Sequence, residues 1–220
     1  MASQQGFVDD TWASPVPAVR HRPKVPLPRT AREDRTPPLP ARSQVECLLY
    51  VELHPCRCGQ TDTAWARHGR SRIDGRHASS FDGDCHGCGT RRHFRFQLPE
   101  EPVAPPSFGG DEPSRIIEPH EFLALGRRAG GMVAGDPAAL PVASAEAALH
   151  VLAVAIAAHE EVVKFIPPGA SVVPPDAFAS PEARSAFERA PAGYDRESLT
   201  ASLAGYRALE DRYRRRLAGR

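Results

Sequence analysis

Four cysteines in two close pairs are the residues of this sequence best suited to chemistry. One residue separates Cys56 from Cys58, two residues separate Cys85 from Cys88, and a glycine follows each pair. Such a turn points two thiolates at one ion, and the glycine accepts the positive φ that lets backbone N–H groups approach the sulfurs. The spacing therefore predicts a Zn²⁺ site with Cys56, Cys58, Cys85 and Cys88 as its four ligands.

Four thiolates fill the coordination sphere of Zn²⁺ and leave no open position for water or substrate. We therefore expect one structural zinc ion, which stabilises a unit whose own apolar core is small. The first pair is tighter than the usual two-residue spacing, so His54 or His86 could replace one cysteine ligand. The fifth cysteine, Cys47, is predicted to be a small buried side chain on a helix.

Two other segments begin like the H-E-x-x-H helix of zinc proteases but lack its second histidine. His159-Glu160 is followed by Val163 where the motif needs histidine, and His120-Glu121 is followed by Ala124. The sequence also lacks a G-x-S-x-G turn, a P-loop and a dinucleotide-binding fingerprint. We therefore expect a protein that is not an enzyme and that has no small-molecule substrate.

Nucleic-acid binding is the alternative function that the arginines suggest. Residues 43–98 hold eight arginines and six acids, but a tetrathiolate zinc site would cancel their net charge of +2. The whole chain has 28 Lys+Arg and 27 Asp+Glu, which gives a net charge of +1 rather than the excess of a dedicated nucleic-acid binder. Under this alternative the contacts would be Arg91, Arg92, Arg95 and Trp65.

The elements that must position the cysteines can be predicted from caps, turns and periodicity. Ser43 and Glu46 form a capping box for a helix that runs to about Leu53, where His54-Pro55 ends it. Asp74-Gly75 is a type I′ turn signal between two strands, and alternating apolar residues indicate a third. The predicted strands cover residues 63–73, 76–84 and 92–98.

The remaining segments are predicted to be a tail, a linker and a helical domain. Residues 1–42 are rich in proline and arginine and are expected to be disordered, and the acidic, proline-rich residues 99–113 are expected to be a linker. Residues 114–220 show helical periodicity. Four helices are predicted here. The first starts at 119 and ends before 130, and the second runs from 144 to 165. The third starts at 181 and ends before 191, and the fourth runs from 195 to 217.

The cysteine pairs and the three strands together resemble the zinc-ribbon superfamily over residues 54–98. That resemblance implies a three-stranded sheet whose Zn²⁺ is held by the four paired cysteines. A fainter similarity links the chain to uncharacterised bacterial proteins of toxin-immunity or secretion neighbourhoods. It is carried by Leu53-His54-Pro55-Cys56, by Arg92-His93-Phe94 and by Lys164-Phe165-Ile166-Pro167. It implies no activity and no functional residue.

The predicted fold class is α+β, with a three-stranded zinc ribbon that follows a helix and is linked to an all-α domain. Residues 1–10 lack the pattern of a signal peptide, and the most apolar window, residues 147–158, is shorter than the about 20 residues that a bilayer requires. We therefore expect a cytoplasmic, bacterial protein that does not bind a membrane. Its predicted function is to bind another protein, as an adaptor or immunity-type factor.

Overall fold

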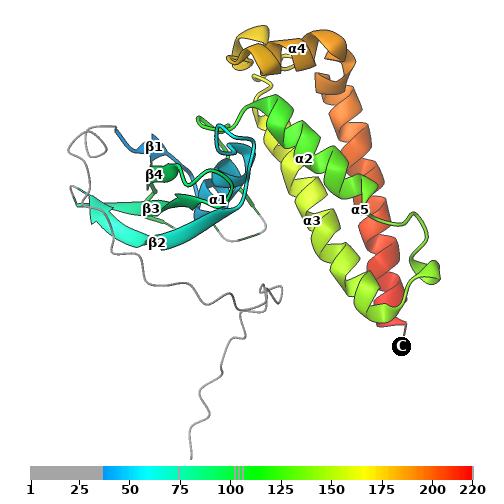
Figure 1. Cartoon of the computed structure of the whole chain (residues 1–220). Helices are drawn as coiled ribbons and strands as arrows, with labels where there is room; N and C mark the ends of the chain where they lie inside the picture. Colours follow the sequence, from blue (N-terminus) through cyan, green and yellow to red (C-terminus); the bar gives the residue numbers. More distant parts are fainter. Residues whose placement is uncertain (1–36, 74, 102, 104, 106, 220) are drawn as a thin grey trace, which may run out of the picture. The chain divides into compact units, whose positions relative to one another are not determined.

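The computed structural model describes residues 37–219, except residues 74, 102, 104 and 106. Residues 1–36, which make up most of the predicted disordered tail, lie outside the described residues. The described residues belong to one compact unit, in which a four-stranded sheet is combined with five α-helices (Figure 1). The predicted α+β class is therefore confirmed.

The first helix, α1 (Gln44–Leu53), begins where the sequence predicts. The Ser43 hydroxyl oxygen accepts a hydrogen bond from the backbone N–H of Glu46 at 3.0 Å. The Glu46 carboxylate, however, accepts the N–H of Arg42 at 2.6 Å, whereas a capping box would return it to Ser43. At the other end, the N–H of His54 donates to the Tyr50 carbonyl at 3.1 Å. Pro55 follows this last bond, as predicted.

The sheet contains the three predicted strands and one that the sequence analysis assigns to the tail. Its order is β1-β4-β3-β2, with β2, β3 and β4 antiparallel and β1 parallel to β4. The strands are β1 (Leu39–Pro40), β2 (Thr63–Ile73), β3 (Arg76–Cys85) and β4 (Arg91–Gln97). Gly75, in the β2–β3 turn, has the positive φ of 78° that the turn signal predicts. Pro40 is tolerated in β1 because this strand lies at the sheet edge.

One face of the sheet packs against α1. Phe81 of β3 and Phe96 of β4 are buried together with Cys47 and Val51 of α1. The rings of Phe81 and Phe96 meet edge to face, with their centroids 5.9 Å apart. Cys47 is fully buried, as predicted, and contributes to this core as an apolar side chain.

Four further helices make up the region after residue 118, close to the predicted positions. Of these, α2, α3 and α5 lie side by side (Figure 1). Their shared core includes Phe122, Val162 and Leu199. The helices are α2 (Pro119–Gly131), α3 (Val142–Lys164), α4 (Pro181–Arg189) and α5 (Arg196–Ala218).

The third helix is longer than the apolar window that the sequence analysis considers. By length and composition α3 could cross a membrane, and it is the one such helix among the described residues. The core helix of a globular protein meets the same criteria. Leu152, Ala155 and Val162 of α3 are fully buried in its packing with the neighbouring helices.

Part of the predicted linker, residues 99–113, is packed into the protein. Phe108 is buried in the same core as Phe122, with the two ring centroids 5.6 Å apart. The Ser43 hydroxyl also donates a hydrogen bond to the Phe108 carbonyl at 2.6 Å. Leu49 of α1 belongs to this core as well. The segment around Phe108 therefore joins α1 to the helices.

Candidate metal centre

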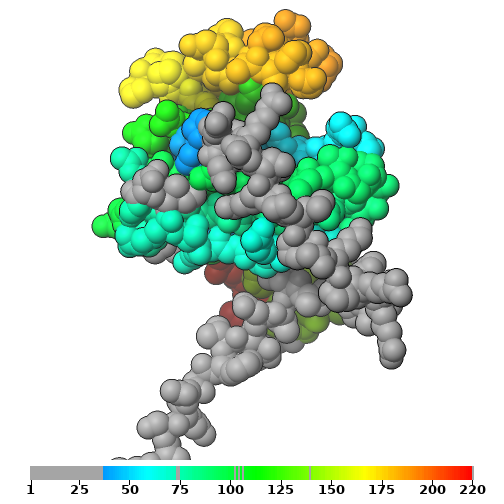
Figure 2. All heavy atoms as spheres, turned by 60° about the vertical axis from the view of Figure 1, so that its left-hand side comes forward, coloured from blue at the N-terminus to red at the C-terminus, as the bar shows by residue number. Residues whose placement is uncertain are grey.

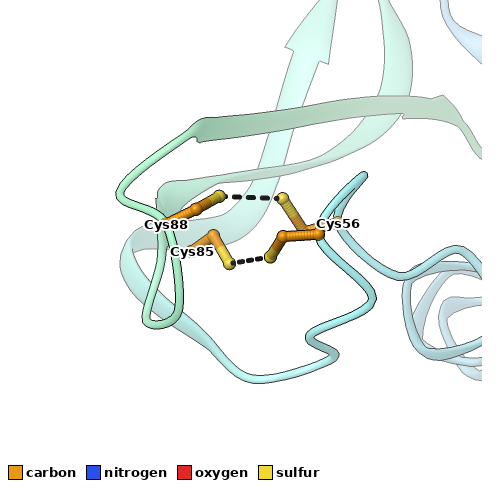
Figure 3. A group of neighbouring side chains, drawn as sticks. Cys56, Cys85 and Cys88 are labelled. Carbon is orange, nitrogen blue, oxygen red and sulfur yellow. Dashed lines mark hydrogen bonds between the residues drawn. The ribbon is translucent and has the colours of Figure 1, made fainter.

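The four paired cysteines meet at one point, with their sulfur atoms turned toward one another (Figure 3). Cys56 Sγ lies 3.5 Å from Cys88 Sγ, and Cys58 Sγ lies 3.6 Å from Cys85 Sγ. All four sulfurs are within 4.8 Å of one another, and none is in a disulfide. Zn–S bonds of about 2.3 Å place the sulfurs of a tetrahedral site roughly 3.8 Å apart. The four cysteines could therefore hold a metal ion with little movement.

Two tight turns bring the cysteines to this point. After α1, the N–H of Cys56 donates to the Gln60 carbonyl at 2.9 Å, and the N–H of Gly59 donates to the Cys56 carbonyl at 2.7 Å. At the end of β3, the N–H of Gly89 donates to the Cys85 carbonyl at 2.9 Å. The glycine of each turn has the predicted positive φ, 84° at Gly59 and 69° at Gly89.

Neither histidine that could replace a cysteine belongs to this group. The His54 ring stacks on Tyr50 with 3.8 Å between centroids, and its Nδ1 donates to the Tyr50 carbonyl at 2.8 Å. His86 Nδ1 lies 2.9 Å from a carboxylate oxygen of Asp62. Both rings thus interact with neighbours outside the sulfur group.

The thiols of the four neighbouring cysteines differ in their pKa values. The side chain and then the backbone of Thr90 hydrogen-bond to Cys88 and, with the nearby thiols, lower the pKa of Cys88 to about 6. A backbone hydrogen bond from Gln60 lowers the pKa of Cys58, but the Cys88 and Cys85 thiols outweigh it and raise that pKa to about 11. Simultaneous ionisation of all four thiols is therefore unfavourable. A cation bound among the sulfurs would favour it, because the cation stabilises the thiolates.

A second group of ionisable side chains is explained by helix capping. Glu118, His120 and Glu121 have ligand atoms within 4.8 Å of one another at the start of α2. The Glu118 carboxylate accepts the N–H groups of Ala179 and Ser180, at 2.7 and 2.8 Å, and the Ser180 hydroxyl at 2.5 Å. Glu121 accepts the N–H of Glu118 at 2.9 Å. These carboxylates therefore satisfy helix-end donors.

The structure buries Arg92, one of the residues proposed for nucleic-acid contact. Its guanidinium donates to the carbonyls of Thr61 and Val51 at 3.1 and 3.2 Å, and to the Thr63 hydroxyl at 2.6 Å. It also lies over the rings of Trp65 and Phe94, 5.4 and 5.2 Å from their centroids. Arg92 thus ties the end of α1 to the sheet beside the sulfur group and is not exposed to a ligand.

The other residues proposed for nucleic-acid contact are partly buried. Arg91 Nη2 lies 2.6 Å from the Asp82 carboxylate, which Arg67 also contacts at 3.0 Å. Trp65 is half-buried against Phe81, with the two ring centroids 5.7 Å apart. Arg95 is partly buried too. Of the four residues proposed for nucleic-acid contact, Arg92 is thus buried and the other three keep part of their surface exposed.

A set of largely buried charges near Phe108 could not be predicted from the sequence. Arg42 binds Glu46 and Glu161 of α3, with Nη2–oxygen distances of 2.6 and 2.8 Å. Lys164 adds a second contact to Glu161, at 2.6 Å, and donates to the Gly110 carbonyl at 2.7 Å. The i,i+4 spacing of Arg42 and Glu46 is visible in the sequence, but the contact from Arg42 to α3 is not.

Comparison of the chain with protein-family models, curated proteins and solved structures finds no match. The resemblance to zinc ribbons therefore depends on the cysteine spacing and the strand pattern alone.

Proposed function

We propose that this protein binds one Zn²⁺ through Cys56, Cys58, Cys85 and Cys88 and serves, without catalysing a reaction, to bind another protein. The observation that supports the proposal most directly is the all-sulfur group, with its two closest S–S contacts at 3.5 and 3.6 Å. Four soft sulfur donors within 4.8 Å of one another suit zinc, and iron is the main competitor for such a site.

The structural role of the metal follows from what it would hold together. Cys56 lies two residues beyond His54, at the end of α1, and Cys85 is the last residue of β3. An ion among the sulfurs would therefore fix the end of α1 to the sheet. Its binding free energy would add to the folding free energy of a region with a small core.

A non-catalytic role is supported by how the ionisable side chains are used. Glu118 and Glu121 cap helix ends, and Arg92 holds backbone carbonyls. His159 is buried in α3, where its Nδ1 donates to the Ala155 carbonyl at 2.8 Å. The carboxylates of the second group of potential metal ligands, Glu118 and Glu121, are thus occupied by hydrogen bonds within the fold.

Metal analysis of the purified full-length chain tests the first half of this proposal. We expect one equivalent of zinc in the wild type, close to none in Cys85→Ser, and an unchanged amount in Cys47→Ser. The last variant is the matched control because Cys47 lies outside the sulfur group. Equal zinc in all three proteins, or a folded wild type without metal, would show that the proposed site is wrong. Finding iron in place of zinc in the wild type would show that the site is an iron site.

Cross-linking mass spectrometry in the source cell tests the second half. A partner that cross-links reproducibly to the wild type, but not to Cys85→Ser at equal abundance, would support a zinc-dependent protein-binding role. Turnover of a substrate by the zinc-loaded protein, lost in a point variant that still folds, would contradict the non-catalytic role.

A further inference from the structure

We infer that the outer edge of β2 binds an acidic, extended peptide of a partner protein as an additional strand. This inference rests on the proposed protein-binding function and names the chemistry of the partner. It concerns the distal part of β2, residues 67–73, which we call the β2 edge.

The β2 edge offers unpaired backbone. In the sheet order β1-β4-β3-β2, β2 pairs with β3 along one side, and no strand among the described residues pairs with its other side. Residues 66–72 are all exposed, and Figure 2 shows the cyan atoms of this region at the surface. Every second residue of such an edge directs its N–H and C=O groups outward, which is the template that an added strand uses.

The charges on this hairpin select an acidic partner. Residues 63–77 contain four arginines and a single acid, Asp74. Arg67 is paired with Asp82, whereas Arg70 and Arg76 are exposed and form no ion pair with any described residue. Arg72 donates to the Gly75 carbonyl at 2.9 Å and also remains exposed. The hairpin thus carries several cations without an acidic partner among the described residues.

Strand register fixes the spacing of acids that would fit. Arg70 is opposite Ser79 and Arg72 is opposite His77, so the two arginines lie on the same face of the sheet. Side chains two residues apart on a strand are separated by about 6.8 Å. An added strand with acids at alternate positions would place one carboxylate beside each arginine.

The same charges disfavour a second copy of this chain. Pairing of two β2 edges would bring arginines opposite arginines, which destabilises a strand pair. The register shift between Trp65 and Arg67 limits the regular edge to the distal half of the strand. An acidic segment of about seven residues from another protein is therefore the occupant that fits.

Binding of synthetic peptides to the full-length, zinc-loaded protein tests the inference. The probe is a fluorescein-labelled nonapeptide of alternating glutamate and threonine, and the readout is fluorescence anisotropy at low salt. One control peptide has glutamine in place of glutamate. A second keeps every charge but carries an N-methyl group on every backbone amide, which removes the N–H donors from both edges of the strand.

We expect the acidic peptide to bind and both control peptides to bind about tenfold more weakly or not at all. Combining Arg70→Glu with Arg72→Glu should weaken binding by about tenfold as well. The matched control, Arg212→Glu with Arg215→Glu, reverses two exposed charges on α5 and should leave the affinity unchanged.

Three results would overturn the inference. Equal binding of the N-methylated peptide would mean that charge alone attracts the probe. Tighter binding of a single-stranded oligonucleotide, with displacement of the peptide, would assign the arginines to nucleic acid. No peptide binding by protein whose zinc content is one equivalent would reject the β2 edge while leaving the zinc site intact. Loss of zinc from the same sample would instead point to failure of the proposed metal centre.

Discussion

Arg42 Nη2 and Glu161 Oε2 lie 2.8 Å apart and connect the residues just before α1 to the middle of the helical region. Both side chains are largely shielded from water, with exposures of 13% and 2%. Glu46 and Lys164 complete the set, so two cations face two carboxylates and the buried charge is balanced. Such a set stabilises the fold only while it is complete, because any member left alone is a buried, unpaired charge.

Replacing one member should therefore be costly. Glu161→Gln removes a carboxylate that binds both Arg42 and Lys164, and we expect the free energy of unfolding to fall by about 3–5 kcal/mol. Urea denaturation followed by circular dichroism measures this loss. The matched control is Glu160→Gln, because Glu160 pairs with Arg207 at the surface and should contribute less than about 1 kcal/mol. Equal losses in the two variants would argue against the buried network.

Arg92 should matter for stability rather than for ligand binding. Arg92→Ala leaves the Val51 and Thr61 carbonyls and the Thr63 hydroxyl without this donor, at an expected cost of about 2–3 kcal/mol. Arg76→Ala, at an exposed position, should change stability by less than about 0.5 kcal/mol. Thermal denaturation compares the two. A stable Arg92→Ala protein that had lost a ligand would return this residue to a binding role.

Two helical glycines should respond to alanine in opposite directions. A methyl group at Gly126 would overlap the buried His159 ring, so we expect Gly126→Ala to lower the free energy of unfolding by about 1–3 kcal/mol. A methyl group at Gly205 of α5 meets nothing within 4 Å. Gly205→Ala should therefore raise stability by about 1 kcal/mol through helix propensity. Melting temperatures that moved in the same direction would contradict this packing.

Stability should decrease when the pH falls below about 6.5, in part because of His159. Burial lowers the pKa of this imidazole, a backbone hydrogen bond to Ala155 raises it, and the charge of Arg127 lowers it, with a net downward shift from 6.5. Between 6.5 and the lowered value the unfolded chain binds more protons, so the free energy of unfolding falls as the pH falls. Urea midpoints at pH 7.5, 6.5 and 5.5 measure this dependence.

The control for that experiment is a pair of histidine variants. His159→Gln should depend on pH less steeply than the wild type, because it lacks this buried imidazole. His150→Gln, at an exposed site on the same helix, should follow the wild type. Identical slopes for all three proteins would remove His159 as a source of the pH dependence.

The five thiols should fall into two reactivity classes once metal is removed. Burial, with a smaller contribution from the charge of Glu46, raises the pKa of Cys47 to about 12, and its side chain has no exposed surface. We expect the four thiols of the sulfur group to react with a chromogenic disulfide in the folded protein after chelation, Cys88 first because its pKa is lowered to about 6, and Cys47 to react only on unfolding. With metal bound, these four thiols should be protected. Rapid reaction of all five in the folded protein would contradict the buried position of Cys47.

Local features of this fold could be predicted because short sequence patterns determine them. Ser43 starts α1, Gly75 lies in the turn between β2 and β3, and Pro119 and Ser180 begin their helices as expected. The turn that holds each cysteine pair follows from the same logic, because it needs only a few neighbouring residues. The two pairs come together because the β2–β3 hairpin places Thr63 opposite Cys85. These elements agree with the structure to within one to three residues at their ends.

What the sequence did not reveal depends on contacts between distant segments. Arg92 looks like any other arginine of an alternating strand until α1 places two carbonyls beside it. Phe108 lies among prolines and glycines that are typical of a linker, yet the helical core buries it. The partner of Arg42 on α3 is 119 positions away, beyond the reach of helical or strand periodicity. The short strand β1, in the predicted tail, was missed for the same reason, because its pairing with β4 joins segments more than 50 residues apart.

Helix α1 contributes buried side chains to two separate hydrophobic cores. Leu49 of α1 packs with the helices, while Cys47 and Val51, on the same three turns, pack with the sheet. A cut within residues 99–113 would therefore divide a shared interior rather than release two self-sufficient modules. Domain-swapping or truncation experiments should keep residues 37–219 together.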